Sequence, residues 1–409
     1  MALVSSLSPV SGLGRYAALF RAPSVPQVVL AGLLGRLPLG LVPIGTVLLV
    51  RGAGHSYAVV GAVVAALSLA SAAAAPFVGR LVDRVGQTRV LIPLALLFPA
   101  SLGLLVLFAN RHASAVLLLV LAAATGFAFP PIGACIRTLW PSMLPAHGLR
   151  ETAYALEAWL QELAFVLGPV LVGGLAALTS ASVAMLVAGA LGLVGTLWFA
   201  LTPPVQAVNG HQGAGVRSRR GALGSPGVRT VIYACIALGC AFGVVEVAMP
   251  AFAEVHATRA QGGFALACFA AGSLIGGLWS GTRAAPPRPE LRFAWMLTAL
   301  GAGLVPPLLA PSLPVMCVLL VLAGIPIAPA FASTYGLVDR LAVPGTTTEA
   351  FSWLSTAIVT GISLGTAVGG VVIEHAGVTW SLALAAPSAL VAAAVVVALR
   401  ASLATASTS

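Results

Sequence analysis

Apolar stretches long enough to cross a membrane follow one another along almost the whole chain. A helix of about 20 residues rises about 30 Å, the thickness of the hydrocarbon core of a bilayer. Such stretches recur twelve times, near residues 26–50, 57–78, 89–109, 114–140, 151–178, 181–201, 229–254, 260–281, 291–310, 313–340, 349–374 and 378–400. The chain of 409 residues is 59% hydrophobic and only 7% charged, which exceeds what a soluble core needs. The sequence therefore predicts an all-α integral membrane protein with twelve transmembrane helices.

The only long polar connection lies in the middle of the chain. It covers residues 203–228, is rich in Gly and Pro, and divides the apolar stretches six and six. This composition is typical of a flexible linker. We therefore expect an N-terminal six-helix bundle over residues 1–202 and a C-terminal six-helix bundle over residues 229–409.

The two halves also resemble each other. An offset of 202 residues relates Gly79 to Gly281, and an offset near 197 relates the Gly-rich segment 168–174 to the segment 365–370. A repeat of this length, with an even number of spans in each half, predicts two pseudo-symmetric bundles with a substrate site at their interface.

The basic charge is distributed unevenly. The chain has 20 Arg and no Lys, and sixteen of the arginines, Arg137 among them, fall on the side of the membrane that holds both termini and the linker. By the positive-inside rule this side is cytoplasmic. Codon bias in a GC-rich bacterial genome explains the Arg content better than nucleic-acid binding does. We expect a multi-pass protein of the bacterial cytoplasmic membrane, with its first span retained and a short basic amphipathic helix over residues 11–22 at the membrane surface.

The sequence lacks the residue patterns of several kinds of catalytic and metal-binding site. The five cysteines lie within apolar runs without a CxxC or a paired His, so we interpret them as packing residues rather than as disulfides or metal ligands. The sequence has no HExxH motif and no P-loop, and Asp83 and Asp339 are its only aspartates. We expect neither an enzyme nor a bound cofactor.

The scarce charge is concentrated in the stretch "GRLVDRVGQTRV", residues 79–90. It resembles the signature loop of the major facilitator superfamily, between the second and third spans. The matching positions are Gly79, Asp83, Arg84, Gly86 and Arg89. Together with the twelve spans, the central linker and the internal repeat, the resemblance covers essentially the whole chain and implies the fold of that family.

The resemblance implies a conformational latch. Asp83 would approach the start of the eleventh span, where "TTTE" predicts a capping box formed by Thr346 and Glu349. The free amide groups of that helix end would attract an anion when the cytoplasmic side closes. Anchoring by the positive-inside effect is an alternative role for the arginines of this loop, but it does not account for Asp83.

The fifth span carries a second resemblance. Its "GPVLVGG" segment is similar to the antiporter signature of drug-exporting members of the family. The matching positions are Gly168, Pro169, Gly173 and Gly174.

Four charged residues are predicted to lie within spans. Arg36 and Glu162 lie at matching depths, so we expect them to form an ion pair or to face a shared cavity; a structural salt bridge and a role in coupling both stay open. Glu157 lies nearer the cytoplasm and is either a coupling residue or a wetted helix end. Glu246, in the seventh span, is either an interfacial carboxylate or a site for a proton or a cationic substrate.

These features favour a secondary active transporter. We expect proton-coupled export of a small amphipathic or hydrophobic compound by a monomer in the bilayer, without nucleic acid. The alternatives are an importer or facilitator of a small metabolite such as a sugar or an amino acid, and a non-transporting membrane sensor of the same fold. Few Asn and Gln residues lie within spans, which disfavours a sugar site.

Overall fold

Twelve long apolar helical segments make up most of the described part of the protein. The computed structural model describes residues 12–144, 147–208, 221–256, 262–283 and 288–404. Twelve helical segments in these ranges are long and apolar enough to cross a membrane, and the described residues contain no strand. The largest departure from the predicted bounds is in the second span, which ends at Val85 rather than at residue 78. The predicted all-α membrane fold is confirmed.

The described residues of the first half form nine helices, because α1 precedes the six spans and two of those spans are divided. They are α1 (Gly14–Arg21), α2 (Val25–Arg36), α3 (Pro38–Gly52), α4 (Tyr57–Val85), α5 (Gln87–Asn110), α6 (Ala115–Phe127), α7 (Ile132–Met143), α8 (His147–Leu178) and α9 (Ala181–Ala200). The segment between the halves contains α10 (Pro203–Val208) and the short 3₁₀ helix η1 (Gly221–Gly224).

The second half begins directly after η1. Its helices are α11 (Pro226–His256), α12 (Gly262–Gly281), α13 (Pro289–Gly303), η3 (Pro306–Leu309), α14 (Leu313–Gly324), α15 (Ile327–Leu341), α16 (Thr347–Ala376), α17 (Val378–Leu382), α18 (Ala385–Ala398) and α19 (Arg400–Ala404).

Prolines explain where several spans divide. Pro38 begins α3 directly after Leu37, Pro131 precedes α7, and Pro326 precedes α15. Proline has no backbone N–H and cannot continue the hydrogen-bond pattern of the preceding helix. The first span is therefore interrupted one residue after Arg36, well inside the membrane.

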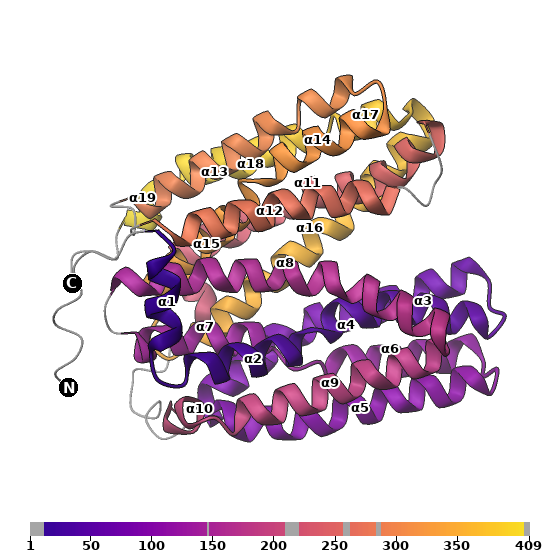
Figure 1. The fold of residues 1–409 in the computed structure, drawn as a ribbon, viewed down its shortest axis with the longest axis horizontal. Helices are drawn as coiled ribbons and strands as arrows, with labels where there is room; N and C mark the ends of the chain where they lie inside the picture. The colour runs from indigo at the N-terminus through magenta and orange to yellow at the C-terminus, as the bar shows by residue number, and fades with distance from the viewer. Residues whose placement is uncertain (1–11, 145–146, 209–220, 257–261, 284–287, 405–409) are drawn as a thin grey trace.

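The helices form two bundles that meet at one end (Figure 1). Helices α2 to α9 pack in the first bundle and α11 to α18 in the second, with α4 against α16 and α8 against α12 and α15 across the interface. Helices α1 and α19 both lie at the end where the bundles meet, and the bundles diverge toward the opposite end. We call the meeting end, which holds Val85, Gly281 and Thr347, the closed end. The opposite end is the diverging end.

Close helix contacts within each bundle depend on small residues. A Cβ atom on Gly361 of α16 would lie only 2.8 Å from the Cα of Gly239 in α11. Two helices in lipid gain little from the hydrophobic effect, so they associate by such close packing instead. This explains how α11 and α16 stay together along their length.

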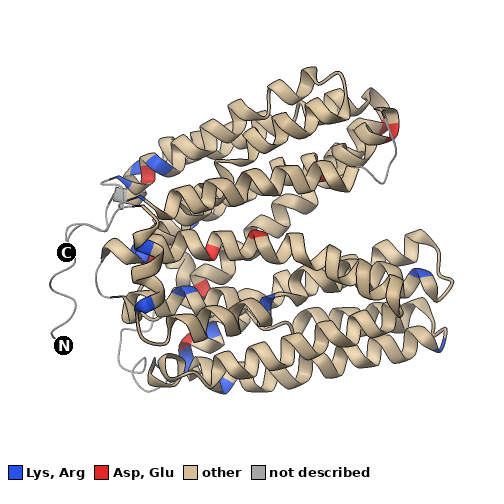
Figure 2. Cartoon of the chain, viewed as in Figure 1, with Lys and Arg blue, Asp and Glu red and all other residues tan. Residues whose placement is uncertain are grey.

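Charge gathers at the closed end (Figure 2). Most of the blue and red segments lie there, and only a few lie at the diverging end. Arg84 and Arg89 are exposed at the closed end, where they flank the junction of α4 and α5. This distribution matches the uneven arrangement of arginines in the sequence.

The prediction of a loop between the second and third spans is wrong, because most of these residues are helical. Residues 79–85 continue α4, and Gln87 already begins α5. Only Gly86 joins the two helices, with φ of +102°, a backbone conformation that glycine adopts without strain. The reversal therefore takes a single residue, and the signature charges lie on the last turns of a helix.

The segment predicted as a flexible linker contains regular structure. Helix α10 packs against α5, η1 packs against α11 and α16, and α11 begins at Pro226, inside the segment 203–228. The arginines at 217, 219 and 220 lie outside the described residues.

Candidate functional site

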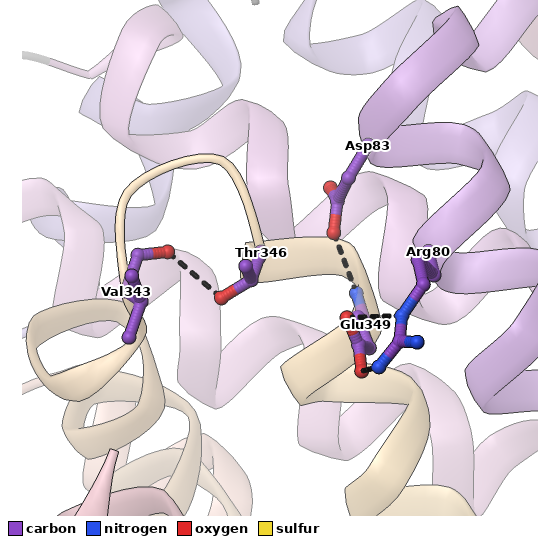
Figure 3. Close-up of polar contacts among 5 residues, drawn as sticks. All are labelled: Arg80, Asp83, Val343, Thr346 and Glu349. Carbon is purple, nitrogen blue, oxygen red and sulfur yellow. Dashed lines mark hydrogen bonds and ion pairs between the residues drawn. The ribbon is translucent and has the colours of Figure 1, made fainter. Parts of the chain in front are cut away.

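The carboxylate of Asp83 lies at the first turn of α16, across the bundle interface (Figure 3). The Thr348 N–H donates to Asp83 Oδ1 at 3.0 Å, and the Glu349 N–H donates to Oδ2 at 2.9 Å. Asp83 is buried, with 6% of its surface exposed. Free N–H groups at a helix start carry partial positive charge and favour an anion. Asp83 thus caps a helix that belongs to the other bundle.

The predicted capping box does not form. The Thr346 hydroxyl donates to the Val343 carbonyl at 2.8 Å and makes no capping hydrogen bond to α16. The Glu349 side chain points to Arg80 rather than back to Thr346 (Figure 3). The physical reason is that both amide groups of a capping box already have acceptors: the Glu349 N–H donates to Asp83, and the Thr346 N–H donates to the Val343 carbonyl at 3.0 Å.

Arg80 forms a two-pronged ion pair with Glu349. Its Nε donates to Glu349 Oε2 at 3.1 Å and its Nη2 to Oε1 at 2.6 Å. Glu349 is almost fully buried, so this pair is a strong, oriented contact between the bundles. Arg80 was not among the latch residues predicted from the sequence, although it precedes Asp83 by one helical turn and therefore shares its face.

Gly79 allows α4 and α16 to approach closely at the same place. A Cβ atom there would lie 2.5 Å from the Ser352 hydroxyl and 2.9 Å from the Thr348 carbonyl oxygen. Any side chain would push the two helices apart. Among the predicted latch residues, the structure therefore brings Gly79, Asp83 and Glu349 together and leaves Arg84 and Arg89 exposed at the surface.

The predicted pairing of Arg36 with Glu162 is wrong. Arg36 Nη2 lies 2.7 Å from Glu157 Oε2, and these two residues are 3% and 0% exposed. Five residues turn a helix by about 140°, so Glu157 and Glu162 point to different sides of α8. Glu157 faces α2 within the first bundle and is a buried ion-pair partner, not a wetted helix end.

Glu162 instead faces the second bundle. Its carboxylate lies beside the Ser273 hydroxyl of α12, and Trp159, one turn earlier on α8, packs at Gly277 of the same helix. No ion pair to Glu162 is present among the described residues. A carboxylate at this depth, between two bundles and without a basic partner, is unusual because burying an unpaired charge is costly.

Arg137 is a site residue that the sequence analysis placed at the membrane surface. In the structure it is buried in α7 and reaches across to Tyr335 of α15, donating from Nη2 to the phenol oxygen at 3.0 Å. Its Cζ also lies 3.9 Å from the centre of the Tyr335 ring, a cation–π contact. The available sequence signal was its position inside the apolar run "GACIRTLW".

Aromatic rings extend from this contact through α15, α11 and α12 of the second bundle. Phe331 lies 6.1 Å from Tyr335 and 6.2 Å from Phe242, which lies 6.3 Å from Phe269, all between ring centres. The charges of Arg36, Arg137, Glu157 and Glu162 all act on the Tyr335 hydroxyl. The structure thus places four membrane-embedded charges and a row of aromatic rings around one region of the interface.

Two other predicted groups lie apart from this region. Glu246 is exposed on α11 rather than enclosed with the other carboxylates. In the antiporter-like segment, a Cβ atom on Gly168 would meet the backbone of Gly40 in α3, so this glycine permits close packing inside the first bundle. Gly173 and Gly174 have open space beside them, and Pro169 lies within α8.

Comparison with protein families identifies the fold. The family model described as Major Facilitator Superfamily matches residues 28–305. The chain belongs to the Major Facilitator Superfamily. Membership, with the twelve candidate membrane spans of the described residues, points to a membrane transporter. A comparison with curated protein sequences gives no match.

Solved structures of facilitator proteins have the same fold. A bacterial homologue of the iron transporter ferroportin in an outward-facing state has a TM-score of 0.74 at 16% identity, covering 92% of this chain and 99% of that one. The human organic anion transporter MFSD10 (TETRAN) has a TM-score of 0.68 at 17% identity, covering 91% and 98%. The facilitator FucP in the outward conformation has a TM-score of 0.70 at 15% identity, covering 91% and 98%. At these identities the likeness concerns the fold.

Proposed function

We propose that the protein is a proton-coupled exporter of a small amphipathic or hydrophobic compound, working by alternating access in a bacterial cytoplasmic membrane. Protons moving inward down their gradient would drive the compound outward. The observation that carries this proposal is the Glu162 carboxylate, which is embedded between the bundles beside Ser273 and has no ion pair among the described residues.

The unpaired carboxylate suits proton coupling. In surroundings of low dielectric it is stable when it is protonated or when a cation lies against it, and costly when it is charged and alone. Binding of a proton and binding of a cationic substrate therefore compete at Glu162. Such competition is the minimum requirement for exchanging one for the other.

The aromatic row supports an amphipathic substrate. Phe242, Phe269 and Phe331 offer apolar area and ring faces, which favour flat apolar groups and organic cations. Few side-chain amides line the spans, so the region is less suited to a polyhydroxylated solute.

The conformation supports alternating access. The arginine-rich closed end is proposed to face the cytoplasm, by the positive-inside rule. The structure then corresponds to an outward-facing state in which Asp83, Arg80 and Gly79 hold the cytoplasmic ends of α4 and α16 together. The Arg137–Tyr335 contact lies between the closed end and the central region, so it is proposed to act as an inner gate.

The buried Arg36–Glu157 pair is proposed to be structural. It joins α8 to the last residue of α2, next to the interruption of the first span at Pro38. The two charges neutralise each other through one contact, while Arg36 Nε and Nη1 and Glu157 Oε1 have no hydrogen-bond partner in the described part of the structure. Protonating Glu157 would leave the buried arginine charge uncompensated, at a large loss of stability.

The proposal is tested by transport into inverted membrane vesicles with an acidic interior. We expect wild-type vesicles to accumulate the lipophilic cation ethidium in a gradient-dependent manner, and Glu162→Gln vesicles to lose that accumulation. Glu374→Gln is the matched control, because Glu374 is an exposed carboxylate near the end of α16.

Two results would redirect the proposal. If Glu162→Gln retained full gradient-driven accumulation, Glu162 would not be the coupling residue. If wild-type vesicles accumulated no ethidium but moved protons when a sugar or an amino acid was added, import or facilitated passage of a metabolite would replace export.

A further inference from the structure

The two halves of the closed end are built differently. In the first half, Asp83 and Arg80 on α4 contact the start of α16. By the repeat offset of 202, Ala285 takes the place of Asp83 in the second half and Thr282 takes the place of Arg80. The related contact, between the end of α12 and the start of α8, therefore lacks both signature charges. Near this contact the start of α8 also pairs with α15, through Glu151 and Arg340 at 3.8 Å. The contact with α12 itself is left to hydrogen bonds.

Helix α1 lies across this second contact (Figure 1). Arg15 donates from Nε to the Thr152 hydroxyl of α8 at 3.1 Å, and its Nη2 donates to the Gly148 carbonyl. The neighbouring Tyr16 hydroxyl lies 3.3 Å from the carbonyl oxygens of both Gly277 and Leu278 at the end of α12. Two consecutive residues of α1 thus bind one bundle each.

The end of α12 is shaped to receive the tyrosine. A Cβ atom on Gly281 would collide with the Tyr16 hydroxyl and ring, so the absence of a side chain there makes room for Tyr16. The Thr152 hydroxyl also donates to the Gly281 carbonyl at 3.0 Å, which links α8 directly to α12 beside α1. Burial raises the pKa of Tyr16 to about 12, so its hydroxyl keeps the proton that it donates.

We propose that α1 is the second latch of the closed end, in which Arg15 and Tyr16 hold α8 against α12 as Asp83 and Arg80 hold α4 against α16. The proposal rests on the proposed function in one respect, namely that the closed end opens during transport. The sequence of α1 predicts a helix anchored at the membrane surface, and its exposed Leu13 and Phe20 are compatible with that. The proposal gives α1 a second role in addition to anchoring.

The test measures opening of the closed end directly. Spin labels are attached to cysteines replacing Ser142 at the end of α7 and Arg288 before α13, both exposed and on different bundles, in a background with the five native cysteines changed to alanine. Distance distributions in lipid nanodiscs then give the ratio of open to closed molecules. Tyr16→Phe removes only the hydroxyl, so the fold is kept, and we expect the ratio to rise about fivefold.

A double-mutant cycle tests the fit between Tyr16 and Gly281. We expect Gly281→Ala to raise the ratio in the presence of Tyr16, because the new methyl group displaces the ring, and to have no further effect when combined with Tyr16→Ala. Arg21→Gln is the control, since Arg21 is exposed at the end of the same helix. It should leave the distribution unchanged.

The outcomes separate this inference from the proposed function. If Tyr16→Phe, Tyr16→Ala and Gly281→Ala all leave the distribution as it is in the wild type, α1 is a surface anchor and the inference is overturned. If the distribution shifts as expected while wild-type vesicles show no proton-driven export, the second latch stands and the proposed function fails.

Discussion

The carboxylate of Asp83 caps a helix whose Thr348 N–H lies 265 residues further along the chain and in the opposite bundle. A cap normally comes from the residue directly before a helix and forms together with it. Here the cap exists only while the two bundles touch. The stability of the first turn of α16 is therefore linked to the conformation of the whole transporter.

Neutralising Asp83 should open the closed end. Asp83→Asn keeps the size of the side chain but removes its charge and offers only one acceptor oxygen to the two N–H groups. With the labels at positions 142 and 288, we expect the ratio of open to closed molecules to rise about tenfold. An unchanged ratio would show that the cap contributes nothing to closure.

A methyl group at position 79 should have a similar effect for a steric reason. Gly79→Ala places a Cβ atom against the Thr348 carbonyl, a backbone atom that cannot move aside, so α4 and α16 must separate. Overpacking of this kind costs about 1–3 kcal/mol. Gly61→Ala is a matched control on the same helix, because nothing lies within 4 Å of its new Cβ. Equal distance distributions for the two variants would contradict the close approach.

The geometry of the Arg80–Glu349 pair should matter as well as its charge. Arg80→Lys keeps the charge but cannot make two parallel hydrogen bonds, so we expect it to open the closed end less than Arg80→Ala and more than the wild type. Because Arg80→Ala leaves a buried carboxylate unpaired, adding Glu349→Gln should restore part of the closed population. Arg111→Ala, an exposed arginine at the diverging end, serves as the control. Strictly additive effects of Arg80→Ala and Glu349→Gln would argue against a coupled pair.

Removing Glu157 should destabilise the fold. Glu157→Gln leaves Arg36 charged and buried, which costs about 3–5 kcal/mol. The expected result is a marked fall in the thermal unfolding temperature in detergent, reversed in large part by the double change Arg36→Met and Glu157→Leu. Glu162→Gln should not lower that temperature, because it removes an unpaired charge. A larger fall in Glu162→Gln than in Glu157→Gln would reverse the roles assigned to the two carboxylates.

The fold was predictable because its causes are local. A span is recognised from about 20 apolar residues, and the order of spans and the repeat follow by counting. Helix bounds erred most at the end of α4, where the charges of Arg80, Asp83 and Arg84 resemble a loop. These charges are compatible with a helix because Arg80 and Asp83 meet partners on α16 and Arg84 is exposed.

The site was only partly predictable, because depth along a helix does not fix direction around it. Arg36 and Glu162 have similar depths, yet Glu157 lies on the side of α8 that faces Arg36. Arg137 was assigned to the surface since its partner, Tyr335, lies 198 positions away. The contacts of Arg15 and Tyr16 on α1 with α8 and α12 were equally hidden, because an amphipathic pattern shows that a helix has two faces but not which helices its polar side chains contact.

The short helix η1 lies directly over the Arg80–Glu349 pair. Gly221, with φ of +59°, comes so close that a Cβ atom there would meet the Arg80 guanidinium and lie 2.6 Å from Glu349 Oε1. Helix η1 therefore helps to cover the Glu349 side of this ion pair, whose side chain is 2% exposed, while the Arg80 side chain stays 39% exposed. Because η1 lies against Arg80 and Glu349, it must move away before these two residues can separate. Any contact that kept η1 in place would therefore slow the cycle of the transporter without touching its substrate.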